Sequence, residues 1–196
     1  DYRVATGEYT LLKEQEVPGG YDKDEYVAYR VWSEAPDGTK VPVSIVHRAD
    51  LDRTKPNPTL LYGYGSYEAN MDPYFSVFRL SLMDRGMIFA MAHVRGGGEM
   101  GRTWYDDGKM LSKKNTFTDF IAVADDLIAR RVTTPETLVA EGGSAGGLLM
   151  GAVANMAPDR FKAIQANVPF VDPLTSILMP ELPLTVVEWE EWGDPF

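Results

Sequence analysis

Short apolar segments separated by turn-forming residues run along most of the chain. Residues 26–32 alternate between apolar and polar side chains like a half-buried strand, Asp37-Gly38 is a typical hairpin turn, and residues 41–46 supply a returning strand. Near-continuous apolar runs are typical of strands buried on both faces of a largely parallel sheet. Four such runs follow the hairpin, at residues 59–62, 87–92, 137–140 and 163–166. The pattern therefore predicts a β-hairpin that leads into a mostly parallel sheet.

Two stretches between these strands have helical spacing. Apolar residues recur every three or four positions over residues 117–128, and Thr116 with Asp119 predicts a variant capping box at the start of that helix. A second apolar stripe covers residues 148–156, and Pro158 marks its end. Alternating strands and helices are typical of the α/β class, with right-handed crossovers.

Composition and charge exclude several kinds of protein. The chain has 196 residues, 44% of them apolar and 24% charged, which is typical of one well-buried domain. The excess of 29 acidic over 19 basic residues gives a charge of −10, which repels nucleic acid. The lack of cysteine excludes disulfides, thiolate metal ligands and a cysteine nucleophile. Since the sequence also lacks a long apolar segment and a signal peptide, we expect a cytoplasmic protein with no membrane association.

The motif most specific for chemistry is Gly-Gly-Ser-Ala-Gly-Gly at residues 142–147, between a predicted strand and a predicted helix. It contains G-x-S-x-G, which places a serine on a tight, strained turn where glycines leave room for backbone and substrate. The helix N-terminus that follows favours developing negative charge. The alternative is a glycine-rich turn that contains a serine by chance or holds a phosphate. The flanking strand and helix favour Ser144 as a nucleophile.

Two other glycine motifs follow predicted strands. Residues 96–101 satisfy G-x-G-x-x-G, which raises the alternative of a non-catalytic nucleotide-binding domain that uses Gly96 to Gly101. However, no apolar helical stripe follows, and no acidic residue ends a second strand about 20 positions later. The Tyr-Gly-Tyr-Gly sequence at residues 62–65 lies where an α/β-hydrolase fold places an oxyanion-hole contributor, although it could equally be a turn that packs on the sheet.

Several spaced segments match the motifs of one known family. They are residues 62–67, 93–99, 114–119 and 142–147, and residues 165–172 with 188–193 match its oligopeptidase B branch. Together they resemble the prolyl oligopeptidase family of serine peptidases. The resemblance implies an α/β-hydrolase fold over residues 25–196, incomplete at its C-terminal side. Residues 1–24 would be the end of a β-propeller or a linker.

The resemblance also implies roles for individual residues. Ser144 matches the nucleophile, the amide of Ala145 one oxyanion donor and the hydroxyl of Tyr64 the other. Glu188 and Glu190 match the carboxylates that bind the basic side chain before the scissile bond. Spaced by two, these acids would share a face if the segment were extended. Without the resemblance, this acidic run is more typical of a solvated surface.

The implied function is the hydrolysis of short peptides after Arg or Lys through an acyl-enzyme, with no metal or organic cofactor. An acylaminoacyl-peptidase or an esterase on the same fold is the nearest alternative, because G-x-S-x-G indicates acyl transfer without specifying the acyl group.

The substrate-binding acids depart from the family pattern at one place. Oligopeptidase B commonly has paired acids in the segment that matches residues 72–74. Here only Asp72 is acidic, and Tyr74 stands in place of its partner. We therefore assign Asp72 to substrate binding but leave open the preference for a second basic residue.

The triad acid and histidine of this fold should follow the serine in sequence. The only histidines, His47 and His93, precede it, and we interpret them as strand or core-edge residues with local hydrogen bonds. Asp172 and Asp194 follow Ser144 too closely to match the triad aspartate. We therefore expect the chain alone to be inactive, with its base supplied by residues outside it.

Overall fold

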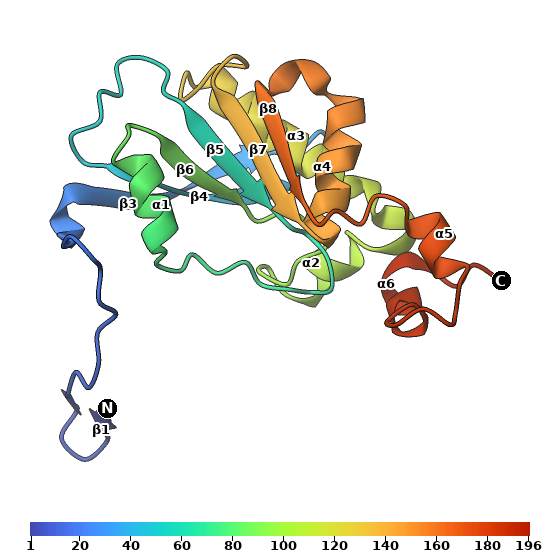
Figure 1. The fold of residues 1–196 in the computed structure, drawn as a ribbon, viewed down its shortest axis with the longest axis horizontal. Helices are drawn as coiled ribbons and strands as arrows, with labels where there is room; N and C mark the ends of the chain where they lie inside the picture. Colours follow the sequence, from blue (N-terminus) through green and yellow to red (C-terminus); the bar gives the residue numbers. More distant parts are fainter.

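A six-stranded sheet forms the centre of the computed structural model, which describes residues 1–196 (Figure 1). Its order is β3-β4-β6-β5-β7-β8, with antiparallel pairs β3/β4 and β4/β6 and parallel pairs β6/β5, β5/β7 and β7/β8. The strands are β3 (Tyr26–Glu34), β4 (Lys40–Arg48), β5 (Thr59–Gly63), β6 (Ile88–Ala92), β7 (Leu138–Gly143) and β8 (Ala163–Asn167). All six predicted strands and the α/β class are confirmed.

Six α-helices connect or follow the strands: α1 (Val77–Met83), α2 (Arg102–Asp106), α3 (Lys114–Ala129), α4 (Ala145–Met156), α5 (Pro173–Ile177) and α6 (Trp189–Trp192). Short 3₁₀ turns cover Lys23–Glu25, Met110–Ser112, Pro158–Arg160 and Val186–Glu188. The two predicted crossover helices are α3 and α4. The other four have only four to seven residues, too few turns for their period to show in the sequence. No helix is both long and apolar enough to cross a bilayer.

Alternate residues of the central strands face two different layers. One face packs against α3 and α4 and forms the main core, to which Leu61, Ala90, Phe120, Leu127 and Leu149 belong. The opposite face carries a smaller cluster, beside which α1 packs. Helices therefore cover both faces, as Figure 1 shows.

The outermost strand differs from the prediction. Strands β5 and β6 are buried on both faces as predicted. In β8, four of the five residues are exposed and only Ile164 is half-buried, so the prediction that residues 163–166 are buried on both faces is wrong. The reason is position, because β8 is the last strand of the sheet and pairs with β7 on one side only.

The first residues stand apart from the sheet. Strands β1 (Tyr2–Arg3) and β2 (Glu8–Tyr9) form a small exposed hairpin, which Figure 1 shows well away from the other strands. The chain first packs on the main body near Tyr21, whose ring lies 5.6 Å from the ring of Tyr26 and 4.9 Å from that of Phe75.

The capping box predicted for α3 is absent. The helix begins at Lys114, two residues before Thr116. The Thr116 hydroxyl donates to the carbonyl of Arg95 at 2.7 Å, and the Asp119 carboxylate accepts hydrogen bonds from Arg95. The prediction is wrong because both side chains bind the loop after β6 instead of the first amides of their own helix.

Arg95 is the centre of a buried ionic network. Its guanidinium donates to the two carboxylate oxygens of Asp119 at 2.9 and 2.6 Å, and its amide donates to the same group at 3.0 Å. A third guanidinium nitrogen donates at 2.6 Å to Asp37 in the turn between β3 and β4. Burial raises the pKa of Asp119, whereas the hydrogen bonds from Arg95 lower it. One side chain thus joins α3, the hairpin turn and the loop after β6.

Loss of this network should destabilise the protein strongly. We expect Arg95→Met to lower the free energy of unfolding by about 3–5 kcal/mol, because Asp119 would remain as a buried charge without its partner. Arg102→Met is the control, since Arg102 forms only exposed ion pairs, which are worth about 0–1 kcal/mol. Urea unfolding measures both variants, and equal losses would contradict the role of Arg95. The double variant Arg95→Met/Asp119→Leu should lose less than Arg95→Met.

The hairpin turn should make stability depend on acid pH. The Thr39 amide and then Arg95 lower the pKa of Asp37 from 3.8 to about 2. Charged Asp37 therefore adds stability above its unfolded pKa, and this contribution disappears as the pH falls through about 2. We expect Asp37→Asn to cost stability at pH 6 and progressively less towards pH 2. Urea unfolding across this range tests it, and a cost that stays constant with pH would argue against it.

Candidate active site

Ser144 forms the turn between β7 and α4. It has φ 57° and ψ −116°, a left-handed backbone that residues other than glycine rarely adopt. Its amide donates to the Asn167 carbonyl at 2.9 Å, and its carbonyl accepts from the Phe170 amide at 3.0 Å. The side chain is exposed. The predicted strand, strained turn and helix are therefore confirmed.

Two glycines of the motif permit close packing around this turn. A Cβ atom on Gly146 would lie 2.8 Å from the carbonyl oxygen of Gly63, at the end of β5. A Cβ atom on Gly147 would lie 2.5 Å from the Cα of Pro169, in the loop after β8. The start of α4 thus touches both neighbouring loops, and the residue after Gly63 lies next to the Ser144 turn.

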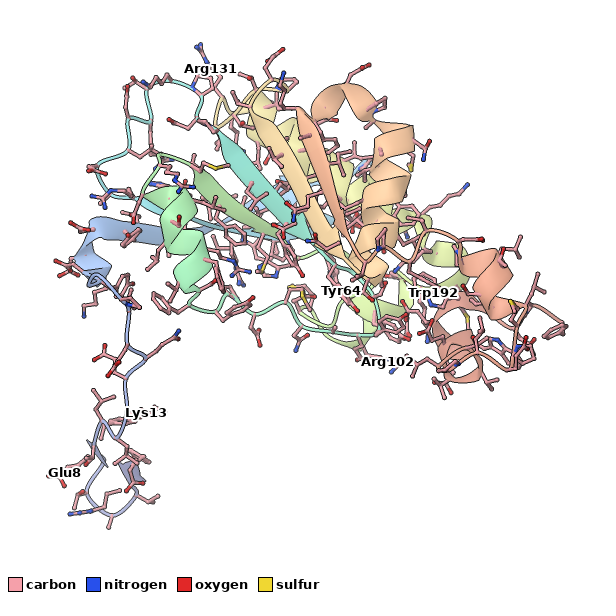
Figure 2. The ribbon with its side chains drawn as sticks, viewed as in Figure 1. Glu8, Lys13, Tyr64, Arg102, Arg131 and Trp192 are labelled. Atoms are coloured by element: carbon pink, nitrogen blue, oxygen red, sulfur yellow. The ribbon has the colours of Figure 1, made fainter.

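That residue is Tyr64, which is half-buried at the carboxyl end of the parallel strands (Figure 2). Burial and then the charge of Glu191 raise the pKa of Tyr64, and the nearby Ser144 hydroxyl opposes this shift. Its phenol therefore keeps its proton at neutral pH and can donate it in a hydrogen bond. The Ala145 amide, the first of α4, has no partner within the helix. The structure brings Ser144, Tyr64 and Ala145 together.

The acidic segment is helical, not extended. Glu188 ends a 3₁₀ turn, and Glu190 lies in α6 directly after it. The condition for sharing a face, an extended segment, is therefore not met, and two helical positions are rotated by about 200° from one another. Glu188 is half-buried, and its charge contributes to the raised pKa values of Tyr64 and Tyr67, after burial as the main cause. Glu190 is exposed.

A third acid of this segment was not singled out from the sequence. Glu191 is three positions from Glu188, on the same helical face, and is 2% exposed. Its carboxylate lies 3.5 Å from the Nζ of Lys113, and neither oxygen accepts a hydrogen bond. No pattern distinguishes Glu191 from Glu190 or Lys113 from Lys114, because the helical phase of so short an element appears only in the structure.

Asp72 lies apart from this group. It is exposed and makes no hydrogen bond or ion pair. It lines a cavity of about 500 Å³ together with Tyr62, Arg79 and Glu141, on the α1 side of the sheet. Tyr74 lines the same cavity and stacks on the Arg79 guanidinium at 4.4 Å. The structure does not bring Asp72 into contact with Ser144 or Tyr64.

The glycines at residues 96–101 are used for packing between loops. A Cβ atom on Gly96 would collide with the carbonyl of Gly65, and one on Gly98 would lie 2.5 Å from the carbonyl of Glu68. The following helix, α2, has five residues. Neighbouring loops fill the space that a pyrophosphate would need, so the geometry gives no support to the nucleotide-binding alternative.

Both histidines are buried, and each makes one local hydrogen bond, as interpreted. His47 Nδ1 lies 2.7 Å from the Arg48 carbonyl, and His93 Nε2 lies 2.8 Å from the Ser44 hydroxyl. They belong to β4 and to the loop after β6, and β5 separates both from β7. Asp172 caps α5 through the Thr175 amide.

The chain is similar in sequence and structure to known peptidases. The chain is 56% identical over all 196 residues to dipeptidyl aminopeptidase BI of Pseudoxanthomonas mexicana and 51% identical over 192 residues to protease 2 of Moraxella lacunata. It superimposes with a TM-score of 0.95 and 55% identity on oligopeptidase B from Trypanosoma brucei with covalently bound antipain, over 99% of the chain. The chain spans 27% to 28% of the length of these three proteins.

Residues 73–196, which contain Ser144 and the acidic segment, match the prolyl oligopeptidase family. This match covers more than half of the chain, and the relatives extend the similarity over residues 1–72 as well. The chain therefore belongs to the prolyl oligopeptidase family.

Proposed function

We propose that this chain supplies the nucleophile and the oxyanion contacts of a serine oligopeptidase that cleaves short peptides after Arg or Lys. The observation that carries the proposal is the exposed Ser144 on a left-handed turn, with Tyr64 packed against Gly146 at the start of the helix that follows. The family and the 55% identity to oligopeptidase B support it.

The reaction begins when the Ser144 oxygen attacks the scissile carbonyl carbon and its proton passes to a general base. His47 and His93 are buried, and β5 separates both from the strand that leads to Ser144, so we infer that a histidine outside these 196 residues is the base. The carbonyl oxygen becomes an oxyanion and accepts hydrogen bonds from the Ala145 amide and the Tyr64 hydroxyl. The C–N bond then breaks, the amine takes the proton, and water hydrolyses the acyl-enzyme.

Substrate preference would come from the acidic segment. The segment lies beside the Tyr64 loop, because Trp192 donates to the Tyr67 hydroxyl at 3.2 Å, and the charge of Glu188 contributes to the raised pKa of Tyr64. Glu190 follows Glu188 by two residues. A guanidinium or ammonium beside the scissile bond could pair with these carboxylates. An ester or an acetylated residue would give the two acids no partner, which argues against an esterase or an acylaminoacyl-peptidase.

We also propose that residues 25–196 form part of the peptidase domain and that residues 1–24 are a linker or the end of a preceding β-propeller. The exposed β1/β2 hairpin, which stands away from the sheet in Figure 1, supports this boundary.

The roles of Ser144 and Tyr64 can be tested in a full-length enzyme that contains this chain. Ser144→Ala should abolish hydrolysis of an arginyl amide. Tyr64→Phe should lower kcat by about 10²–10³, because one oxyanion donor is lost while the ring remains. Tyr62→Phe is the matched control, since Tyr62 lies two residues before Tyr64, in β5, and packs on the face of the sheet that α1 covers. Steady-state kinetics measures all three, and normal kcat in Tyr64→Phe would exclude its role.

Substrates of different charge test whether Glu188 and Glu190 bind the basic side chain. Glu188→Gln should lower kcat/KM for arginyl amides by about tenfold to a hundredfold and change it much less for leucyl amides, because a charge-assisted hydrogen bond is lost. Glu190→Gln should act in the same direction but more weakly, since Glu190 is exposed. Glu181→Gln, an exposed acid of the same region, serves as control. An unchanged ratio of Arg to Leu cleavage in the Glu188→Gln/Glu190→Gln double variant would reduce the proposal to a generic peptidase of this family.

Asp72→Asn belongs to the same measurement. It should alter preference only at the residue before the basic one, and weakly, because Asp72 is exposed and Tyr74 replaces its acidic partner. Substrates that differ at that residue alone report the change.

A further inference from the structure

Lys113, the residue before α3, binds the loop that carries Tyr64. Its Nζ donates to the carbonyl of Gly65 and to the hydroxyl of Ser66, each at 2.6 Å. The Lys113 side chain is only 11% exposed, and Ser66 is fully buried. These two acceptors directly follow Tyr64, so the ammonium group holds the backbone from which the Tyr64 side chain extends.

The same ammonium group also binds α6. It lies 3.5 Å from a carboxylate oxygen of Glu191 and 5.1 Å from the centre of the Trp192 ring. Trp192 in turn donates its indole N–H to the Tyr67 hydroxyl at 3.2 Å and packs on the ring of Phe170 at 5.5 Å. Figure 2 shows Tyr64 and Trp192 at the same end of the sheet.

The contact between Lys113 and Glu191 balances two buried charges. Glu191 is buried, neither of its oxygens accepts a well-aligned hydrogen bond, and Lys113 is the one cation within 4 Å of its carboxylate. The Tyr105 phenol is a second polar neighbour, whose pKa is raised by burial and then by Glu191. Burial lowers the pKa of Lys113 to about 8, and Glu191 opposes this shift. A buried carboxylate without its cation is strongly unfavourable, so α6 would move if the ammonium group were removed. Because Lys113 neutralises Glu191, the carboxylate that remains free to face a substrate cation on this side of α6 is Glu188.

We propose that Lys113 is a positioning residue that sets the oxyanion donor and the substrate-binding acids in one fixed arrangement, by binding the Tyr64 loop and α6 at the same time. The inference rests on the proposed peptidase function. The buried Lys113 side chain thereby links the catalytic rate, which depends on Tyr64, to the preference for basic residues, which depends on Glu188.

The test is Lys113→Met in the full-length enzyme, with Lys114→Met as the matched control. Lys114 is the next residue, is exposed and makes no hydrogen bond or ion pair. We expect Lys113→Met to lower kcat by about tenfold to a hundredfold, as misplacement of a catalytic group by about 1 Å does, and to lower the ratio of Arg to Leu cleavage. Lys114→Met should change neither quantity. Lys113→Arg, which keeps the charge, should recover part of both.

A double-mutant cycle distinguishes positioning from a general loss of stability. If Lys113 acts through Tyr64, then Lys113→Met should lower kcat for a leucyl amide no more than about twofold in the Tyr64→Phe background. Equal effects in both backgrounds, or identical kinetics for Lys113→Met and Lys114→Met, would overturn the inference.

Two further variants keep the test decisive if Lys113→Met does not fold. Ser66→Ala breaks one contact to the Tyr64 loop and should lower kcat without changing the Arg to Leu ratio. Glu191→Gln breaks the contact to α6 and should lower that ratio with little effect on kcat for leucyl amides. Changes in the reverse pattern, or in neither quantity, would overturn the inference. Persistent activity in Ser144→Ala would instead show that the proposed function itself is wrong.

Discussion

The buried hydrogen bonds between Arg95 and Asp119 are the interaction on which the active-site end of this sheet depends. Asp119 and Thr116 lie on α3, and Lys113 directly precedes it. All three side chains, spaced by three positions, bind neighbouring loops. Asp119 binds the loop after β6, Thr116 binds the loop after α2, and Lys113 binds the loop after β5. Burial of this ion pair costs free energy of desolvation, which its hydrogen bonds offset. The ion pair fixes a single arrangement of the loops.

The second constraint is the approach of α4 to β5. Ser144 adopts a backbone that costs about 1–3 kcal/mol in a residue other than glycine. The hydrogen bonds from its amide and carbonyl to the loop after β8 hold this conformation, and the glycine at position 146 lets the helix start against the end of β5. The strained turn therefore places the exposed Ser144 hydroxyl, the Ala145 amide and the Tyr64 phenol close together.

Acidic residues have different surroundings at the surface and in the segment of residues 188–193. The overall charge of −10 comes mostly from solvated acids. Glu191 is one of the few buried acids, and it lies against Lys113. Glu188 lies on the same helical face but does not pair with Lys113. Two acids close in sequence thus differ in environment, since Glu191 is buried against a cation and Glu188 is half-buried without an ion pair.

The sequence by itself determined the α/β class, the six strands, the two long helices and the strained serine turn, because period, turn residues and glycine spacing are local properties. The resemblance to the prolyl oligopeptidase family added the expected roles of Tyr64, Glu188 and Glu190. Only the tertiary structure decided that β8 is an exposed edge strand, that Thr116 and Asp119 bind a distant loop, and that the acidic segment is helical. It also decided which lysine and which glutamate of adjacent pairs are buried. These features depend on contacts between residues far apart in the chain. The pattern of residue types along the sequence does not specify which distant residue a side chain will contact.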